Sequence, residues 1–195
     1  MGDVRRLSIK ARSQRRRVHW RFSLVLLQMQ AGDKMIRITL TQDEQIEAHR
    51  IGLYRAMSQN QSSNTKQVVS FHENIARDAE AVGAEMAVAR YFRIPDFAPT
   101  LDGYKRQADI GTNIEVKWTK WKDGHLILSE RDRKEDVAVL VTGTSPVYYV
   151  VGWIPIAIAR RPQAQRSDKS WWINQSDLHP MENFLRSSYG EHSAI

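Results

Sequence analysis

The residues best suited to chemistry lie in the segment ADIGTNIEVKW, residues 108–118. In a strand, alternate side chains share a face, so Glu115 and Lys117 would project side by side while apolar residues face the other way. Asp109 precedes Glu115 across a turn at Gly111, and a hairpin return would bring the two carboxylates together. Two carboxylates beside a lysine suit a hard divalent cation, with the ammonium near an attacking water or a phosphate.

A third carboxylate is available from a predicted helix over residues 72–92, in which apolar residues recur at steps of three and four. With Ile75 at the centre of the apolar stripe, Glu85 falls about 80° from that centre at about 100° per residue. A helix packed over the sheet could therefore aim Glu85 at the same pocket. Glu80 falls about 140° away and is expected in solvent.

The ordered set Glu85, Asp109 and Glu115-Val116-Lys117 resembles the signature of the PD-(D/E)XK nuclease superfamily, which has the restriction-endonuclease-like fold. More narrowly, the chain resembles an uncharacterised set of tailed-phage proteins of this type over about residues 35–185. The segments that carry this resemblance are GAEMAVARYF, ADIG…IEVKW, DGHLIL, VLVTG, VVGWI and WWINQSDLHPM.

This resemblance implies a central sheet flanked by helices and Mg²⁺-dependent hydrolysis of DNA phosphodiester bonds, with Mn²⁺ as a possible substitute. Asp109 and Glu115 would be the metal ligands, Glu85 would complete or tune the metal site, and Lys117 would orient the water or help to deprotonate it. The chain departs from the superfamily in having Ala108 where a proline is usual. The superfamily also tends to place a helix after the strand that carries the lysine. Here the interval 129–136 is short and polar, which predicts a degenerate or missing helix.

Simpler interpretations compete with this one. Taken without the family pattern, Glu115 and Lys117 are an ordinary strand ion pair, and Glu85 is a surface helix residue. The rival function is a catalytically inactive protein with the nuclease fold, acting as a DNA-binding module or as a phage accessory or interaction module.

The remaining pattern predicts an α/β (α+β) chain with a single domain over residues 35–190 and a central mixed β-sheet. Thr41 and Glu44 have capping-box spacing at the start of a helix over 42–57, in which Ile46, Leu53 and Met57 recur on one side. A polar loop follows at 58–67. Short strands are predicted at 35–40, 107–110, 114–119, 126–129, 137–141, 147–154 and 171–173, with a short helix at 180–185.

The net charge of +7 is confined to a basic N-terminal arm over residues 1–34, which holds nine of the 29 basic residues and two of the 22 acidic ones. The remaining 20 basic and 20 acidic residues cancel. The arm is either a functional, phosphate-binding segment or a dispensable leader. The candidate DNA contacts are Arg15, Arg16 and Arg17 in the arm and Lys120, Lys122 and His125 after the lysine strand.

Several classes of protein are excluded. The absence of cysteine rules out disulfides and thiolate metal sites. No GxxxxGK loop indicates a nucleotide cofactor, and no H-x-x-x-H pair indicates a zinc hydrolase. The apolar run 22–27 is too short for a signal peptide or a membrane span, which predicts an intracellular protein, in the bacterial cytoplasm if phage-encoded. A homodimer would suit the cutting of two strands.

Overall fold

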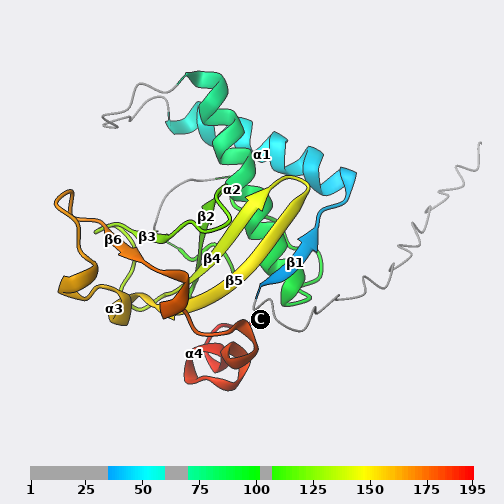
Figure 1. Cartoon of the computed structure of the whole chain (residues 1–195). Helices are drawn as coiled ribbons and strands as arrows, with labels where there is room; N and C mark the ends of the chain where they lie inside the picture. The colour runs from blue at the N-terminus through cyan, green and yellow to red at the C-terminus, as the bar shows by residue number, and fades with distance from the viewer. Residues whose placement is uncertain (1–34, 60–69, 102–106) are drawn as a thin grey trace, which may run out of the picture.

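The computed structural model describes residues 35–59, 70–101 and 107–195 of the 195-residue chain (Figure 1). The predicted basic arm, including Arg15, Arg16 and Arg17, lies outside the described residues, as does most of the loop predicted at 58–67. The described part is mixed α and β, with a central mixed sheet flanked by helices, as predicted.

Two long helices, α1 (Gln42–Gln59) and α2 (Phe71–Tyr91), pack against each other. Both begin with a capping box. Thr41 and Glu44 exchange hydrogen bonds at the start of α1, as the sequence predicts, and Ser70 and Glu73 do the same at α2. These caps satisfy backbone N–H groups that the first turn leaves without helical partners.

The central sheet has the strand order β1-β5-β4-β2. Its strands are β1 (Ile36–Thr39), β2 (Ile114–Thr119), β4 (Val137–Thr144) and β5 (Val147–Pro155). β2 pairs in parallel with β4, and the other pairs are antiparallel. A second sheet joins β3 (Leu126–Leu128) to β6 (Trp171–Ile173). Residues 120–136, all described, connect β2 to β4 through β3 and turns with no helix, which confirms the prediction that a helix is missing from the interval 129–136.

The central sheet is covered on both faces, which explains the almost wholly apolar β4 and β5. On one face, Val139 and Val141 pack with residues of α1 and α2. On the other, Ala138 and Leu140 pack with the β3–β6 sheet and with the short helix α3 (Ile156–Ala159). The C-terminal segment adds three 3₁₀ turns and the short helix α4, and Figure 1 shows its last part, with α4, below the sheet. These elements are η1 (Pro162–Ala164), η2 (Gln175–Asp177), η3 (Met181–Arg186) and α4 (Ser188–Glu191).

The predicted apolar side of the first helix is wrong. Ile46, Leu53 and Met57 are exposed, and α1 instead buries a face that includes Ala48 and Ile51. Small residues allow α1 to approach α2 closely, and this gain in packing outweighs the burial of larger side chains elsewhere on the helix.

Three further expectations need correction. Glu80 is not in solvent: its carboxylate accepts hydrogen bonds from the Tyr148 hydroxyl at 2.7 Å and from the Ser145 backbone N–H at 3.0 Å. The prediction for Glu80 assumed one apolar stripe on this helix. It failed because α2 lies between α1 and the sheet and buries residues on more than one side. The strand predicted at 107–110 is reduced to one bridge residue, Ile110, and the short helix predicted at 180–185 is the 3₁₀ turn η3.

None of the helices in the described ranges has the length and apolar character needed to cross a membrane.

The close approach of α1 to α2 gives the first prediction. A Cβ at Gly52 would lie 2.5 Å from the Ala79 backbone nitrogen. Gly52→Ala should therefore destabilise the protein by about 1–3 kcal/mol through overpacking, although alanine is the better helix former. Urea denaturation measures the change. Ala76→Gly, at an exposed position of α2, serves as the control and should cost only the helix propensity, about 1 kcal/mol. A Gly52→Ala protein more stable than the wild type would contradict the packing.

Candidate functional site

The candidate site is built around β2, an edge strand whose two sides differ chemically. Ile114, Val116 and Trp118 pack on the core beneath α2. Glu115 and Lys117 face the other way, on the side that the β2–β4 connection covers. The predicted alternation of this strand is therefore confirmed.

Asp109 reaches β2 by the predicted turn. Ile110 and Ile114 form an antiparallel bridge around Gly111, whose φ of 57° lies in the left-handed region that glycine readily adopts. The turn brings an Asp109 carboxylate oxygen to 2.7 Å from the backbone N–H of Val116, which donates to it. Asp109 is thus fixed at the open edge of β2, beside the residue that separates Glu115 from Lys117.

Lys117 lies between two buried carboxylates. Its Nζ is 2.8 Å from a Glu115 oxygen and 2.7 Å from an Asp132 oxygen. Both acids are only 3% exposed, and buried charged groups need ion-pair or hydrogen-bond partners. The ammonium therefore joins β2 to the β2–β4 connection through charge-assisted hydrogen bonds.

Asp132 is the site residue that sequence reasoning missed. Its second carboxylate oxygen accepts from the backbone N–H and the hydroxyl of Ser129, and Arg160 donates to its backbone carbonyl. The one signal in the sequence is the Ser129–Asp132 spacing, which is typical of a side-chain-capped turn. That signal could not single out Asp132 among the four acidic residues between 129 and 137.

A second ion pair, between the half-buried Arg133 and the buried Asp136, fixes the end of the same connection. Arg133 donates to both carboxylate oxygens of Asp136, at 2.8 and 2.7 Å, and to the carbonyl of Thr112. Burial raises the pKa of Asp136, Arg133 opposes that rise, and the nearby charge of Glu115 adds to it. Glu115 thus belongs to a group of charges that also includes Asp136 and Arg133.

Glu85 is buried and ion-paired. Both of its carboxylate oxygens accept from Arg55 of α1, at 2.6 and 2.9 Å, and the same guanidinium donates to the Thr100 carbonyl. Arg55, which sequence reasoning also missed, carries no motif signal. Glu85 is therefore not the surface helix residue of the simpler interpretation, and the prediction that it completes or tunes a metal site stays a prediction.

Arg55 connects Glu85 electrostatically with Asp109. Burial alone lowers the pKa of Arg55, but the hydrogen bonds and charge of Glu85 raise it, with smaller contributions from Asp109 and Asp78, and the net shift is upward. Glu85 and Asp109 thus act on one guanidinium, although they come from different elements. This guanidinium stays protonated at any pH at which the protein would work.

The donor chemistry of the site fits Mg²⁺. Asp109 and Glu115 offer hard carboxylate oxygens, and each carboxylate has about four acceptor positions, so their hydrogen bonds are compatible with coordination of a cation. Within the described ranges, no three His, Asp or Glu side chains form a ready-made metal group. Mg²⁺ commonly takes only one or two protein carboxylates and fills its shell with water and substrate phosphate.

The candidate DNA contacts that the structure describes lie just beyond β2. Lys120 and Lys122 are exposed, and Lys120 Nζ lies 4.8 Å from the centroid of the Trp121 ring. His125 is half-buried, with its ring 5.5 Å from that of Trp172. Trp153 is buried, whereas Trp118 is half-buried at the edge of the core.

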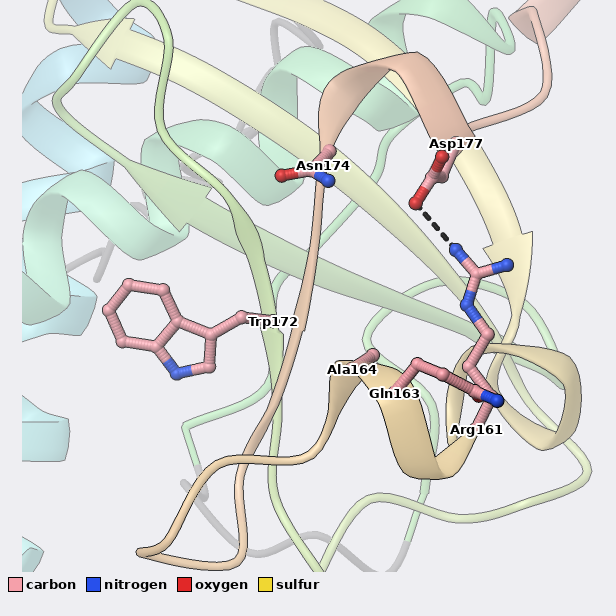
Figure 2. A pocket seen from close by; sticks show the side chains of 6 residues that line it. All are labelled: Arg161, Gln163, Ala164, Trp172, Asn174 and Asp177. Atoms are coloured by element: carbon pink, nitrogen blue, oxygen red, sulfur yellow. Dashed lines mark hydrogen bonds and ion pairs between the residues drawn. The ribbon is translucent and has the colours of Figure 1, made fainter.

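An open hollow of about 420 Å³ lies away from Asp109 and Glu115, between η1, β6 and η2 (Figure 2). An ion pair between Arg161 and Asp177 lies on one side of it, and the ring of Trp172 points away from that pair. The hollow contains none of the residues predicted to act on a phosphodiester.

Comparison with protein-family models, curated proteins and solved structures finds no match to this chain.

Asp78 gives a prediction about pH. This residue of α2 is buried, and its Oδ2 has no hydrogen-bond partner within the described structure. Burial raises its pKa above the unfolded value, although Arg77 and Arg55 oppose the rise. The favourable contribution of protonated Asp78 is therefore complete below the unfolded pKa and is lost as the pH rises through the folded pKa. Asp78→Asn removes this loss.

We expect Asp78→Asn to have a higher Tm than the wild type at pH 7 and to approach it near pH 3, as thermal unfolding at both pH values would measure. Glu47→Gln, at a half-buried position of α1 where Arg50 lowers the pKa of the carboxylate, should not reproduce the neutral-pH gain. A lower Tm for Asp78→Asn at pH 7 would mean that Arg55 and Arg77 stabilise an ionised Asp78.

Proposed function

We propose that this protein is a Mg²⁺-dependent deoxyribonuclease with the restriction-endonuclease-like core of the PD-(D/E)XK superfamily, acting in the cytoplasm of a phage-infected bacterium. The observation that carries the proposal is the convergence of Asp109, Glu115 and Lys117 on one edge strand. The Asp109 carboxylate is hydrogen-bonded to the strand between the other two residues, and Lys117 Nζ is 2.8 Å from Glu115. The open edge of β2 would give a DNA phosphate access to this set.

In this mechanism Asp109 and Glu115 would hold the metal, and Glu85 would tune the site through Arg55, whose charge also interacts with Asp109. The metal, when bound, lowers the pKa of a coordinated water and neutralises charge on the scissile phosphate. Lys117 donates to the attacking water or to the phosphate and stabilises the charge that develops there. Asp132 holds Lys117 in position from the far side.

One observation favours the rival function. Lys117 is paired with two carboxylates, and both oxygens of Glu85 accept hydrogen bonds from Arg55. A catalytically inactive site, in which these groups serve only the fold, would have the same pairings. A catalytically inactive protein with this fold would still bind DNA through its basic arm and through Lys120 and Lys122. Cleavage assays separate the two functions.

The test is cleavage of supercoiled, linear, single-stranded and branched DNA with Mg²⁺ or Mn²⁺. We expect Lys117→Ala, Asp109→Asn and Glu115→Gln each to lower the rate by at least about 10³-fold, because each removes a group that acts on the transition state. Lys134→Ala, an exposed lysine of the same connection, is the matched control and should cleave as the wild type does. Full metal-dependent activity in Lys117→Ala would contradict the catalytic role assigned to Lys117. No cleavage by the wild type, with DNA still bound, would favour the inactive module.

Asp132 gives a separate prediction, because it acts through Lys117 and touches no substrate. Asp132→Asn should lower kcat by about 10–100-fold, as changes to residues that orient a site do, with KM little altered. Glu135→Gln, an exposed neighbour, should leave both constants unchanged. Steady-state kinetics on the DNA substrate that is cleaved fastest measures kcat and KM separately. A rise in KM with kcat unchanged would show that Asp132 serves DNA binding instead.

A further inference from the structure

Two exposed tryptophans stand out on the β3–β6 side of the molecule. Trp121 is 63% exposed and Trp172 is 37% exposed, although tryptophan is usually well buried. Each has a cation over its ring: Lys120 Nζ lies 4.8 Å from the Trp121 centroid, and the Arg166 guanidinium carbon lies 5.5 Å from that of Trp172. The site proposed around β2 uses neither tryptophan.

The two-stranded sheet directs one of these rings outward. Trp172 is paired with Ile127, and both side chains are exposed. The neighbouring residues Leu126, Leu128 and Ile173 point inward and are fully buried in the core. The buried inner side chains fix the backbone of this sheet. Binding to its outer face would therefore lose little backbone conformational entropy.

The other ring is fastened to the same sheet. The turn that carries Trp121 closes with a hydrogen bond from Gly124 N–H to the Trp121 carbonyl. Gln175 then donates to the carbonyls of Lys122 and Gly124, which ties this turn to the segment after β6. His125, at the end of the turn, lies with its ring 5.5 Å from that of Trp172. The turn that carries Trp121 is thus tied to the segment after β6, and its end at His125 lies beside Trp172.

We propose that these residues form a tryptophan platform (Lys120, Trp121, His125, Arg166 and Trp172) that binds single-stranded DNA by stacking unpaired bases on its rings. We choose single-stranded DNA as the ligand because each ring is paired with a cation. A base can stack on the indole through its π-face, and the neighbouring phosphate can pair with the lysine or arginine. Paired bases stack on each other and not on a protein ring. The platform therefore selects a single strand over a duplex, whose phosphates it would meet only through its cations.

This inference takes DNA as the ligand from the proposed function and adds the substrate class. Because Lys120 and Trp121 directly follow the last residue of β2, a strand stacked on the platform would lead toward the edge that carries Asp109 and Lys117. A substrate with an unpaired segment beside the cleavage point then fits better than an uninterrupted duplex.

The test measures binding by the full chain in EDTA, so that no cleavage intervenes, by fluorescence anisotropy of a labelled oligothymidine of about 12 nucleotides and of a duplex of the same length. The double variant Trp121→Ala/Trp172→Ala should raise the Kd for the single strand by about fivefold or more for each tryptophan, while the Kd for the duplex changes by less than about twofold. Replacement of both by phenylalanine, which keeps a stacking ring, should restore most of the single-strand affinity.

Tyr54→Ala is the matched control, because Tyr54 is also exposed and also has a cation, Arg50, over its ring at 5.6 Å, but lies on α1. It should leave both Kd values unchanged. Three results would each overturn the platform: wild-type single-strand affinity in the double variant, an equal loss for single strand and duplex, or no single-strand binding by the wild type. The last two would point to purely electrostatic binding and to a protein partner for the rings.

Cleavage by the wild type with Mg²⁺ is scored separately. Cleavage together with unchanged single-strand binding in the double variant would keep the nuclease and reject the platform. Loss of binding in that variant without cleavage by the wild type would keep the platform and reject the nuclease.

Discussion

The arrangement of the site depends on the pairing of two buried carboxylates, Glu115 and Asp132, with one ammonium, that of Lys117. Loss of one partner from a buried ion pair leaves an uncompensated charge and typically costs about 3–5 kcal/mol. The pairing therefore holds the inner side of β2 against the β2–β4 connection.

A second constraint is the double coverage of the central sheet. β4 and β5 are buried on both faces, so they can carry almost no polar chemistry, and the polar groups gather where coverage is incomplete, at the edge strand β2. The two layers then bring different charges to that edge. The helical layer contributes the Arg55–Glu85 pair, and the connection on the opposite side contributes Asp132. Asp109 lies between them, hydrogen-bonded to the edge itself.

The connection from β2 to β4 contains β3 and no helix. A helix would cover this side of the sheet with one amphipathic face. The β3–β6 sheet instead covers the core with Leu126, Leu128 and Ile173 and leaves its other face, with Trp172, in solvent. An exposed surface suited to stacking thus lies directly after the strand that carries Glu115 and Lys117.

The sequence alone determined the local features, because these depend on neighbours in the chain. The Thr41–Glu44 cap, the alternation along β2 and the turn that returns Asp109 to it were all predicted correctly. Tertiary packing decided which side of α1 is buried, the partners of Glu80 and Glu85, and the choice of Asp132 to hold Lys117. Those outcomes depend on groups far apart in sequence, whose approach is set by packing volume and by the cost of leaving a buried charge unpaired, and neither quantity can be read from spacing.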